Sequence, residues 1–146
     1  MRIIVINGPN LNLLGKRDKS MYGSKTLDEI NSALKEQGEK LGVDIAFFQS
    51  NHEGALIDFI QEQTLGTDGI IINPGALTHY GLSLMDALID TKLPIIEVHI
   101  SDIHSREEFR QKSVIEPIAT KQISGQGWQG YSTALDILAS DLSKGS

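Results

Sequence analysis

Several features are missing from this sequence, and each absence excludes a class of function. None of the 146 residues is cysteine, which excludes a disulfide framework, a thiolate nucleophile and a cysteine zinc site. Basic residues are not in excess: 13 Lys and Arg against 19 Asp and Glu give a net charge of −6, so we expect no nucleic-acid partner. No apolar run is long enough to span a membrane, and no signal-peptide pattern precedes the first apolar run, so we expect a cytoplasmic protein without membrane contact.

Motifs for other chemistries are also missing or incomplete. No Gly-x-Ser-x-Gly sequence occurs, which argues against a serine hydrolase. Gly15–Arg17 lacks the Ser or Thr of a phosphate-binding P-loop. Gly125–Gly130 has the dinucleotide-binding spacing, but no strand or acidic residue follows, so we attribute these glycines to close helix–sheet packing. His99 and Asp102 would face opposite sides of a strand, so we expect no metal site.

The length fits one domain, which we place at 1–146, and apolar runs alternate with helical patterns along it. Strands that alternate with helices indicate a parallel sheet covered by helices on both faces, an α/β fold, and this length favours the flavodoxin-like order of five strands. The expected strands are Ile3–Ile6, Val43–Phe48, Gly69–Asn73, Ile95–Ile100 and Ala119–Ser124.

Two capping-box patterns mark expected helix starts. Thr26–Glu29 precedes a helix that ends near Gly42, and Ser50–Glu53 precedes one that stops around Gly66. The inward stripe of the first carries Leu27, Ile30, Leu34 and Leu41, and that of a third helix carries Leu82, Met85, Leu88 and Ile89. We expect one or two helical turns over Ser105–Lys112 and a last amphipathic helix over Tyr131–Leu142.

Polar side chains collect where three of the apolar strands end. In a parallel sheet these ends share one edge, so the side chains converge on one crevice. An amide or imidazole there has an ordinary explanation, because Asn often satisfies turn backbone and a histidine can cap a helix, but the group together favours a ligand site. Its members are Asn7, Asn10, Asn73, Thr78, His79, Glu97, His99 and Ser101.

Glu97 and His99 lie two residues apart in a strand and therefore on the same face. A carboxylate beside an imidazole holds one tautomer and suits a general acid or base. The alternative is a core histidine that is merely hydrogen-bonded.

The loop after the first strand carries Arg17 and Tyr22 between Gly15 and Gly23. A free tyrosine has a pKa of about 10 and is a poor base at neutral pH, but a nearby guanidinium favours the phenolate. The glycines would let the loop close as a lid. Arg17 and Tyr22 could each instead be an ordinary loop side chain. Arg110 could bind a carboxylate in bidentate fashion, or it could be an ordinary surface arginine.

A series of longer motifs spans nearly the whole chain. The opening motif runs from Ile6 to Gly15 and continues with Arg17 and Tyr22-Gly23. The motifs that follow are Gln49–Gly54, Asn73–Ala76, Thr78-His79, Asp86-Ala87, Ile96–Ser101, Arg106–Arg110, Pro117–Ala119 and Gly130-Tyr131. In their residues and their order, these motifs resemble the type II 3-dehydroquinate dehydratases.

The resemblance implies a hydro-lyase that eliminates water from 3-dehydroquinate through an enolate to give 3-dehydroshikimate, the third step of the shikimate pathway to chorismate. By residue correspondence, Tyr22 is the proton acceptor, Arg17 keeps Tyr22 ionised, Asn10 stabilises the enolate, and His99 donates a proton to the leaving hydroxyl. The substrate-binding positions are Asn73, His79, Asp86, Ile100, Ser101 and Arg110, with Glu97 behind His99.

The family further implies no cofactor, no metal and assembly into a homododecamer of four trimers, in which Asp86 could serve a neighbouring subunit. The lid departs from the usual family sequence at Asp18–Met21, where a glutamate and a proline commonly follow the arginine. Leu77, Tyr80, Gly81 and Met85 depart around the third strand's loop. Two rival hypotheses are a non-catalytic flavodoxin-like module and a catalytically inactive homologue.

Overall fold

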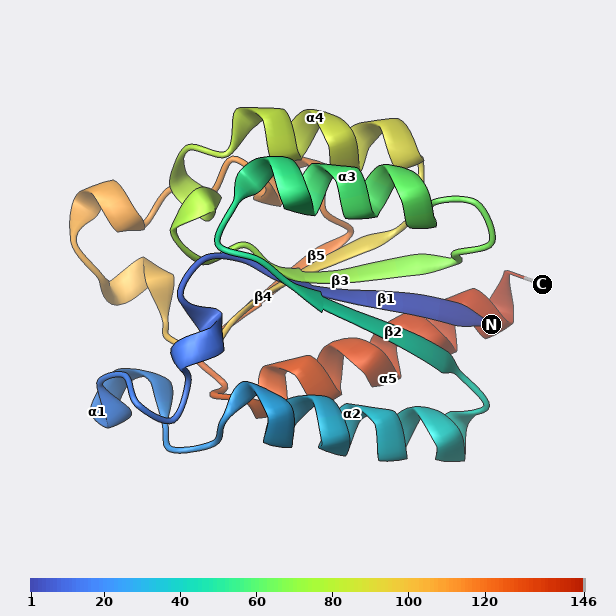
Figure 1. Cartoon of the computed structure of the whole chain (residues 1–146), viewed down its shortest axis with the longest axis horizontal. Coiled ribbons are helices and arrows are strands. Elements are labelled where there is room, and N and C mark those ends of the chain that lie inside the picture. Colours follow the sequence, from blue (N-terminus) through green and yellow to red (C-terminus); the bar gives the residue numbers. More distant parts are fainter. Residues whose placement is uncertain (146) are drawn as a thin grey trace.

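The structure, a computed structural model that describes residues 1–145, is built on one five-stranded parallel sheet (Figure 1). The strand order is β2-β1-β3-β4-β5, which confirms the expected flavodoxin-like arrangement. The strands are β1 (Arg2–Asn7), β2 (Asp44–Gln49), β3 (Gly69–Asn73), β4 (Ile95–His99) and β5 (Lys121–Ser124).

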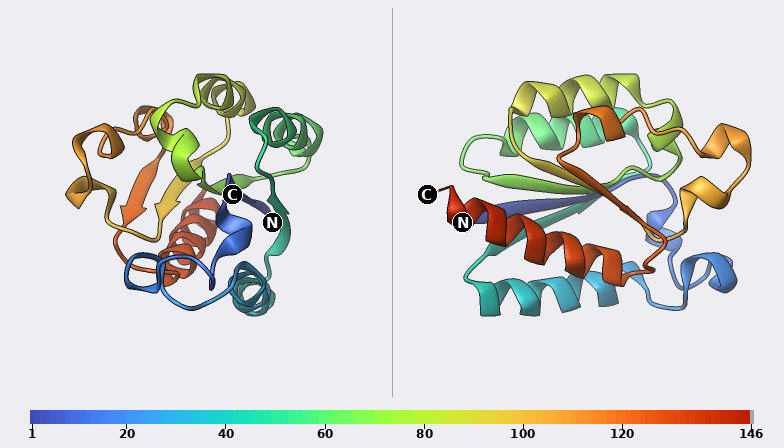
Figure 2. Two further views of the ribbon diagram at one scale, coloured as in Figure 1. Left: turned by 60° about the vertical axis from the view of Figure 1, so that its left-hand side comes forward. Right: turned by 180° about the vertical axis from the view of Figure 1, so that it is seen from behind.

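Helices cover both faces of the sheet, as expected. Figures 1 and 2 show α2 and α5 on one face and α3 and α4 on the other, while the short α1 lies beyond one edge. No helix of the described chain is long and apolar enough to cross a membrane. The helices are α1 (Lys19–Tyr22), α2 (Leu27–Leu41), α3 (Glu53–Gln63), α4 (Leu82–Thr91) and α5 (Gln129–Lys144).

The alternation of side chains along each strand produces two separate cores. Ile3 and Val5 of β1 face the core beneath α2 and α5, whereas Ile4 and Ile6 face the core beneath α3 and α4. All four side chains are fully buried, which explains why β1 is an unbroken β-branched run. At the start of α5, a Cβ on Gly130 would lie 3.3 Å from Val98 Cγ1, so the expected close helix–sheet packing is confirmed at Gly130. The expectation was wrong for Gly125 and Gly127, which take positive φ in the turn before the helix.

The first capping box is present and the second is not. In α2, Thr26 Oγ1 accepts from Glu29 N and Glu29 Oε1 accepts from Thr26 N, and Gly42 ends the helix at a positive φ. The expectation for α3 was wrong: its N-cap is His52, with no side-chain cap bond. Glu53 Oε2 instead accepts the backbone N–H of Leu84, because the first turn of α4 also leaves amide donors without helical partners.

Two expected apolar stripes also need correction. Leu41 at the end of α2 is exposed, and so are Leu82 and Ile89 in α4. In α4, Leu88 is buried as expected, and Leu84 and Ala87 are buried in place of Leu82 and Ile89. The expected helical turns over Ser105–Lys112 are 3₁₀ turns, η3 (Ile103–Ser105) and η4 (Glu108–Arg110). The remaining 3₁₀ turns are η1 (Leu11–Leu13), η2 (Gly75–His79) and η5 (Glu116–Ile118).

The loops after β1 and β3 pack tightly together at the carboxyl edge of the sheet. Gly8 N donates to Asn73 O at 2.8 Å, and a Cβ on Gly8 would lie only 2.3 Å from Pro74 O. Only glycine therefore permits this approach of the two backbones. Helix α1 and η1–η4 cluster at this same edge, while β1 starts and α5 ends at the opposite one (Figures 1 and 2).

Candidate active site

A cavity of about 160 Å³ lies over the carboxyl ends of β1, β3 and β4. The structure brings together at its wall nine of the residues that the sequence singled out: Asn10, Arg17, Tyr22, Asn73, His79, His99, Ile100, Ser101 and Arg110. Arg106 from the loop after β4 also lines it. Open parallel sheets place their ligands at this edge, so the cavity is the candidate active site.

The short helix α1 carries Tyr22 over the cavity. Asp18 caps the helix: its Oδ1 accepts from the backbone N–H of Ser20 at 3.0 Å and from the Ser20 hydroxyl at 2.6 Å. The hydrogen bond from that hydroxyl is the main reason why the pKa of the Asp18 carboxyl lies below its usual value. Gly23 ends the helix at φ 75°. The residues that depart from the usual family lid, Asp18–Met21, thus form the N-cap and the first residues of a helical turn.

Two guanidinium groups contact the Tyr22 ring. Arg17 Cζ lies 4.0 Å from the ring centroid, over its face, and Arg106 Nη1 donates to Tyr22 Oη at 3.1 Å. The sequence predicted Arg17 as the partner of Tyr22. It marked Arg106 only as part of the matching motif Arg106–Arg110 and gave it no role, because Arg106 is 84 residues away from Tyr22 in a charged segment typical of protein surfaces.

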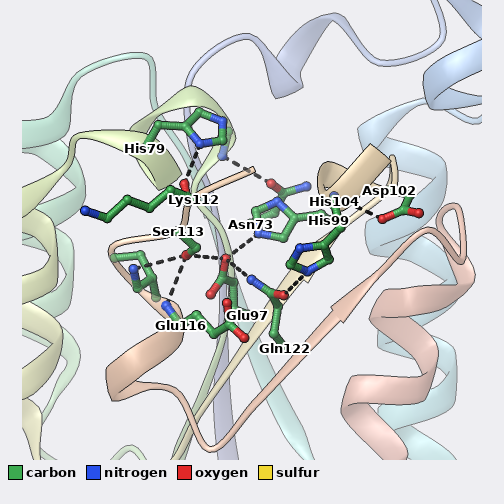
Figure 3. Close-up of polar contacts among 12 residues, drawn as sticks. Asn73, His79, Glu97, His99, Asp102, His104, Lys112, Ser113, Glu116 and Gln122 are labelled. Carbon is green, nitrogen blue, oxygen red and sulfur yellow. Dashed lines mark hydrogen bonds and ion pairs between the residues drawn. The ribbon is translucent and has the colours of Figure 1, made fainter. Parts of the chain in front are cut away.

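His99 and Glu97 contact each other, as their spacing predicted. Glu97 is fully buried, and its Oε2 accepts from His99 Nε2 (Figure 3). The same oxygen accepts from Ser113 Oγ at 2.7 Å and from Gln122 Nε2 at 3.1 Å. Since Nε2 of His99 is bonded to Glu97, Nδ1 is the ring nitrogen left for a ligand in the cavity.

Asn73 is held from behind by a buried tyrosine. Its Nδ2 donates to Tyr131 Oη at 2.9 Å, its Oδ1 accepts from Gly75 N at 3.1 Å, and Tyr131 Oη donates to Asn7 Oδ1 at 2.6 Å. Burial raises the pKa of Tyr131 far above its usual value, so the side chain stays a neutral phenol. Two bonds therefore fix the orientation of the Asn73 amide at the cavity.

Asn10 adopts the left-handed conformation, with φ 70°, which asparagine tolerates better than most residues. Its backbone N–H donates at 2.9 Å to Oδ1 of Asn51, a residue of the loop between β2 and α3. The contact ties the first cavity loop to a second loop, and the sequence gave no indication of it.

The remaining expected residues lie at the rim or outside. Nδ1 of His79 donates to the backbone carbonyl of Lys112 at 2.7 Å, and Arg110 Nε lies 3.4 Å from Glu107 Oε2. Asp86 lies on the exposed surface of α4 and does not line the cavity. Within residues 1–145, no three His, Asp or Glu side chains are grouped closely enough to hold a metal ion.

Comparison with known proteins identifies relatives over almost the full length. The model of the family described as dehydroquinase class II matches residues 1–139. The 3-dehydroquinate dehydratase of Roseiflexus castenholzii is 58% identical over 145 residues, which cover 99% of this chain and 92% of that protein. Among solved structures, the type II dehydroquinase of Butyrivibrio crossotus superposes with a TM-score of 0.92 at 50% identity and covers 94% of this chain and 97% of that one. The type II dehydroquinase of Propionibacterium acnes also gives 0.92, at 41% identity and with 96% and 97% covered.

Proposed function

Because this chain belongs to the class II dehydroquinase family, we propose that its cavity uses Tyr22 as the base and His99 as the acid. The chain is a hydro-lyase that eliminates water from 3-dehydroquinate to give 3-dehydroshikimate, the third step of the shikimate pathway. The observation that carries the assignment of roles is that Tyr22 and His99 line one cavity and each has a charged partner.

Tyr22 removes the proton beside the substrate ketone. A phenolate is needed for this step, and the guanidinium groups of Arg17 and Arg106 both favour negative charge on the ring. Because Arg106 donates directly to Oη, it stabilises the reacting oxygen itself, while Arg17 acts from the ring face. The sequence-based hypothesis of one arginine is therefore extended to two.

The resulting enolate is stabilised near Asn10, whose backbone is held in place by Asn51. His99 then donates a proton to the departing hydroxyl from Nδ1, while its Nε2–H stays bonded to Glu97. The buried carboxylate compensates the positive charge of an imidazolium at that position. Asn73, His79, Arg110, Ser101 and the Ile100 backbone bind the substrate hydroxyl and carboxylate groups.

The test is a spectrophotometric assay with 3-dehydroquinate and a chelator, in which the conjugated product absorbs in the ultraviolet. Tyr22→Phe removes the base and is expected to lower kcat by roughly 10²- to 10⁴-fold while a substrate analogue still binds. Tyr80→Phe is the matched control, because Tyr80 is exposed and outside the cavity. Near-normal turnover in Tyr22→Phe would reject the assigned base.

His99 is tested in the same assay. His99→Ala is expected to reduce kcat by roughly 10²-fold or more without unfolding the protein. His52→Ala is its control, since His52 is exposed at the start of α3 and makes no side-chain cap bond. A wild-type rate in His99→Ala would remove it as the acid.

We also propose, from family membership, a single catalytic domain over 1–146, a cytoplasmic location and a homododecamer of four trimers. Asp86 then serves the cavity of a neighbouring subunit, which is consistent with its exposed position outside its own cavity. Asp86→Asn should lose activity while sedimentation shows an intact assembly, and Asp90→Asn on the same helix should not. Full activity in Asp86→Asn would reject that role.

A further inference from the structure

We propose that Gln122 is a positioning residue for the acid, because its amide joins the carboxylate of Glu97 to the imidazole of His104 behind the cavity. Gln122 belongs to β5 and does not line the cavity, so it acts through Glu97 and His99 (Figure 3). The inference rests on the proposed role of His99 as the proton donor.

The Glu97 carboxylate depends on few donors. All of its hydrogen bonds go to Oε2, from His99, Ser113 and Gln122, while Oε1 is buried and has no partner among residues 1–145. A fully buried carboxylate is stable only if hydrogen bonds and opposite charge compensate it. Within residues 1–145, the Gln122 amide is thus one of two donors to Glu97 besides His99 itself.

The chemistry of the neighbours fixes the direction of the Gln122 amide. An ionised carboxylate can only accept, so the amide nitrogen must face Glu97, at 3.1 Å. The amide oxygen then faces His104 Nε2 at 2.8 Å, which requires a proton on that nitrogen. A flipped amide would set its oxygen against the carboxylate oxygen of Glu97. With its proton on Nε2, His104 adds a second hydrogen bond, which holds the Gln122 amide in the orientation that Glu97 requires.

His104 is itself fixed at the protein surface. Asp102 Oδ1 accepts the backbone N–H of His104 at 3.1 Å, which holds the short turn η3 beside β5. Figure 3 shows the resulting series of contacts from Asp102 through His104 and Gln122 to Glu97 and His99. The side chains of Glu97, Gln122 and His104 thus connect the acid at the cavity to a surface turn, and Asp102 bonds the backbone of that turn.

The other donor, Ser113, has an additional structural task. Its Oγ accepts from the backbone N–H groups of Ile115 at 3.1 Å and Glu116 at 3.0 Å, so its loss would also disturb the loop before β5. Gln122 makes no backbone contact of that kind, and its side chain is the better position for a test. Without its donor, the carboxylate is less restrained, and so is the ring that must aim Nδ1 at the leaving hydroxyl.

Gln122→Met removes the donor at similar length, and Gln122→Glu replaces the donor with a second carboxylate beside Glu97. We expect kcat to fall roughly three- to tenfold in Gln122→Met and further in Gln122→Glu, where two adjacent carboxylates would share a proton and the single negative charge opposite His99 would be divided between them. KM should stay within about twofold, because Gln122 does not touch the cavity. Gln122→Asn keeps the amide but shortens its reach, so its kcat should also fall. It replaces Gln122→Met in the assay if Gln122→Met unfolds at too low a temperature.

The control is Gln37→Met, which removes an amide that joins α2 to α5 through Ser132 O and Asp136 far from the cavity. It should retain wild-type kcat even if its melting temperature falls. Wild-type kcat in all folded Gln122 variants, a rise in KM as large as the fall in kcat, or an equal fall in Gln37→Met would overturn the proposal. A wild-type rate in His99→Ala would instead reject the acid itself, so the two failures are distinguishable.

Discussion

The phenol of Tyr131 donates to the amide oxygen of Asn7 at 2.6 Å across 124 residues of sequence. The Tyr131 hydroxyl oxygen also accepts from Asn73 Nδ2, so one hydroxyl joins α5 to the ends of both β1 and β3. All three side chains are buried, and their hydrogen bonds are therefore costly to remove. The relationship connects the stability of the fold to the position of a substrate-binding amide.

Tyr131→Phe should destabilise the protein by about 1–3 kcal/mol, because the Asn7 oxygen and the Asn73 amide nitrogen lose a partner in the core. Urea unfolding followed by circular dichroism measures the change. KM should rise more than kcat falls, since Asn73 is proposed to bind substrate. An unchanged unfolding midpoint would show that these groups find other partners.

Arg106→Met should lower kcat by roughly 10²-fold, because the donor to the reacting oxygen of Tyr22 is lost while Arg17 remains. Arg106→Lys keeps the charge without the planar donor geometry, so its kcat should lie between those of Arg106→Met and wild type. The measurement is steady-state turnover of 3-dehydroquinate. Arg2→Met is the control, because its guanidinium bonds Thr67 and Gln63 away from the cavity. Equal rates for Arg106→Met and wild type would contradict the role.

Asp18→Ala should reduce kcat/KM by roughly two- to tenfold, because the four-residue α1 that carries Tyr22 loses its N-cap. Asp18→Asn keeps an acceptor oxygen and should restore most of the loss. Asp58→Ala, an exposed change on α3, serves as the control. If Asp18→Asn were as impaired as Asp18→Ala, charge rather than capping would be responsible.

The Glu29 capping box should make stability depend on pH. Its hydrogen bonds with Thr26, chiefly the one from the backbone N–H, hold the pKa of the Glu29 carboxyl below its usual value. A lowered pKa stabilises the fold above the ordinary glutamate pKa of about 4.3, and the contribution is lost as the pH falls through the folded-state pKa. Glu29→Gln should therefore be less stable than wild type at pH 7 in thermal melts, and the difference should shrink as the solution is acidified through the folded-state pKa. A difference independent of pH would contradict this account.

Much of the fold follows from local patterns. β1 and β3 are unbroken β-branched runs, and such runs have no solution except burial between two layers, so the sheet was predictable. The period of two along β4 likewise predicted the contact of Glu97 with His99. The capping box predicted from Ser50–Glu53 was wrong because a capping box is a local pattern. In the folded chain the Glu53 carboxylate bonds the first turn of α4 instead.

The contacts of Tyr131, Arg106 and Gln122 could not be predicted in the same way. Each depends on how a helix, a 3₁₀ segment or an edge strand docks against the sheet, and nothing within their own sequence windows specifies that partner. Tyr131 sits on the inward face of an amphipathic helix, where a tyrosine is ordinarily a core residue. Only the tertiary arrangement shows that its hydroxyl reaches the strand ends.

The separation of the two edges of the sheet has a practical side. β1 starts and α5 ends at the edge opposite the cavity, with strands of up to six residues, roughly 20 Å, between them (Figure 1). A fusion partner, affinity tag or surface linker attached at either end therefore points away from α1 and the cavity mouth.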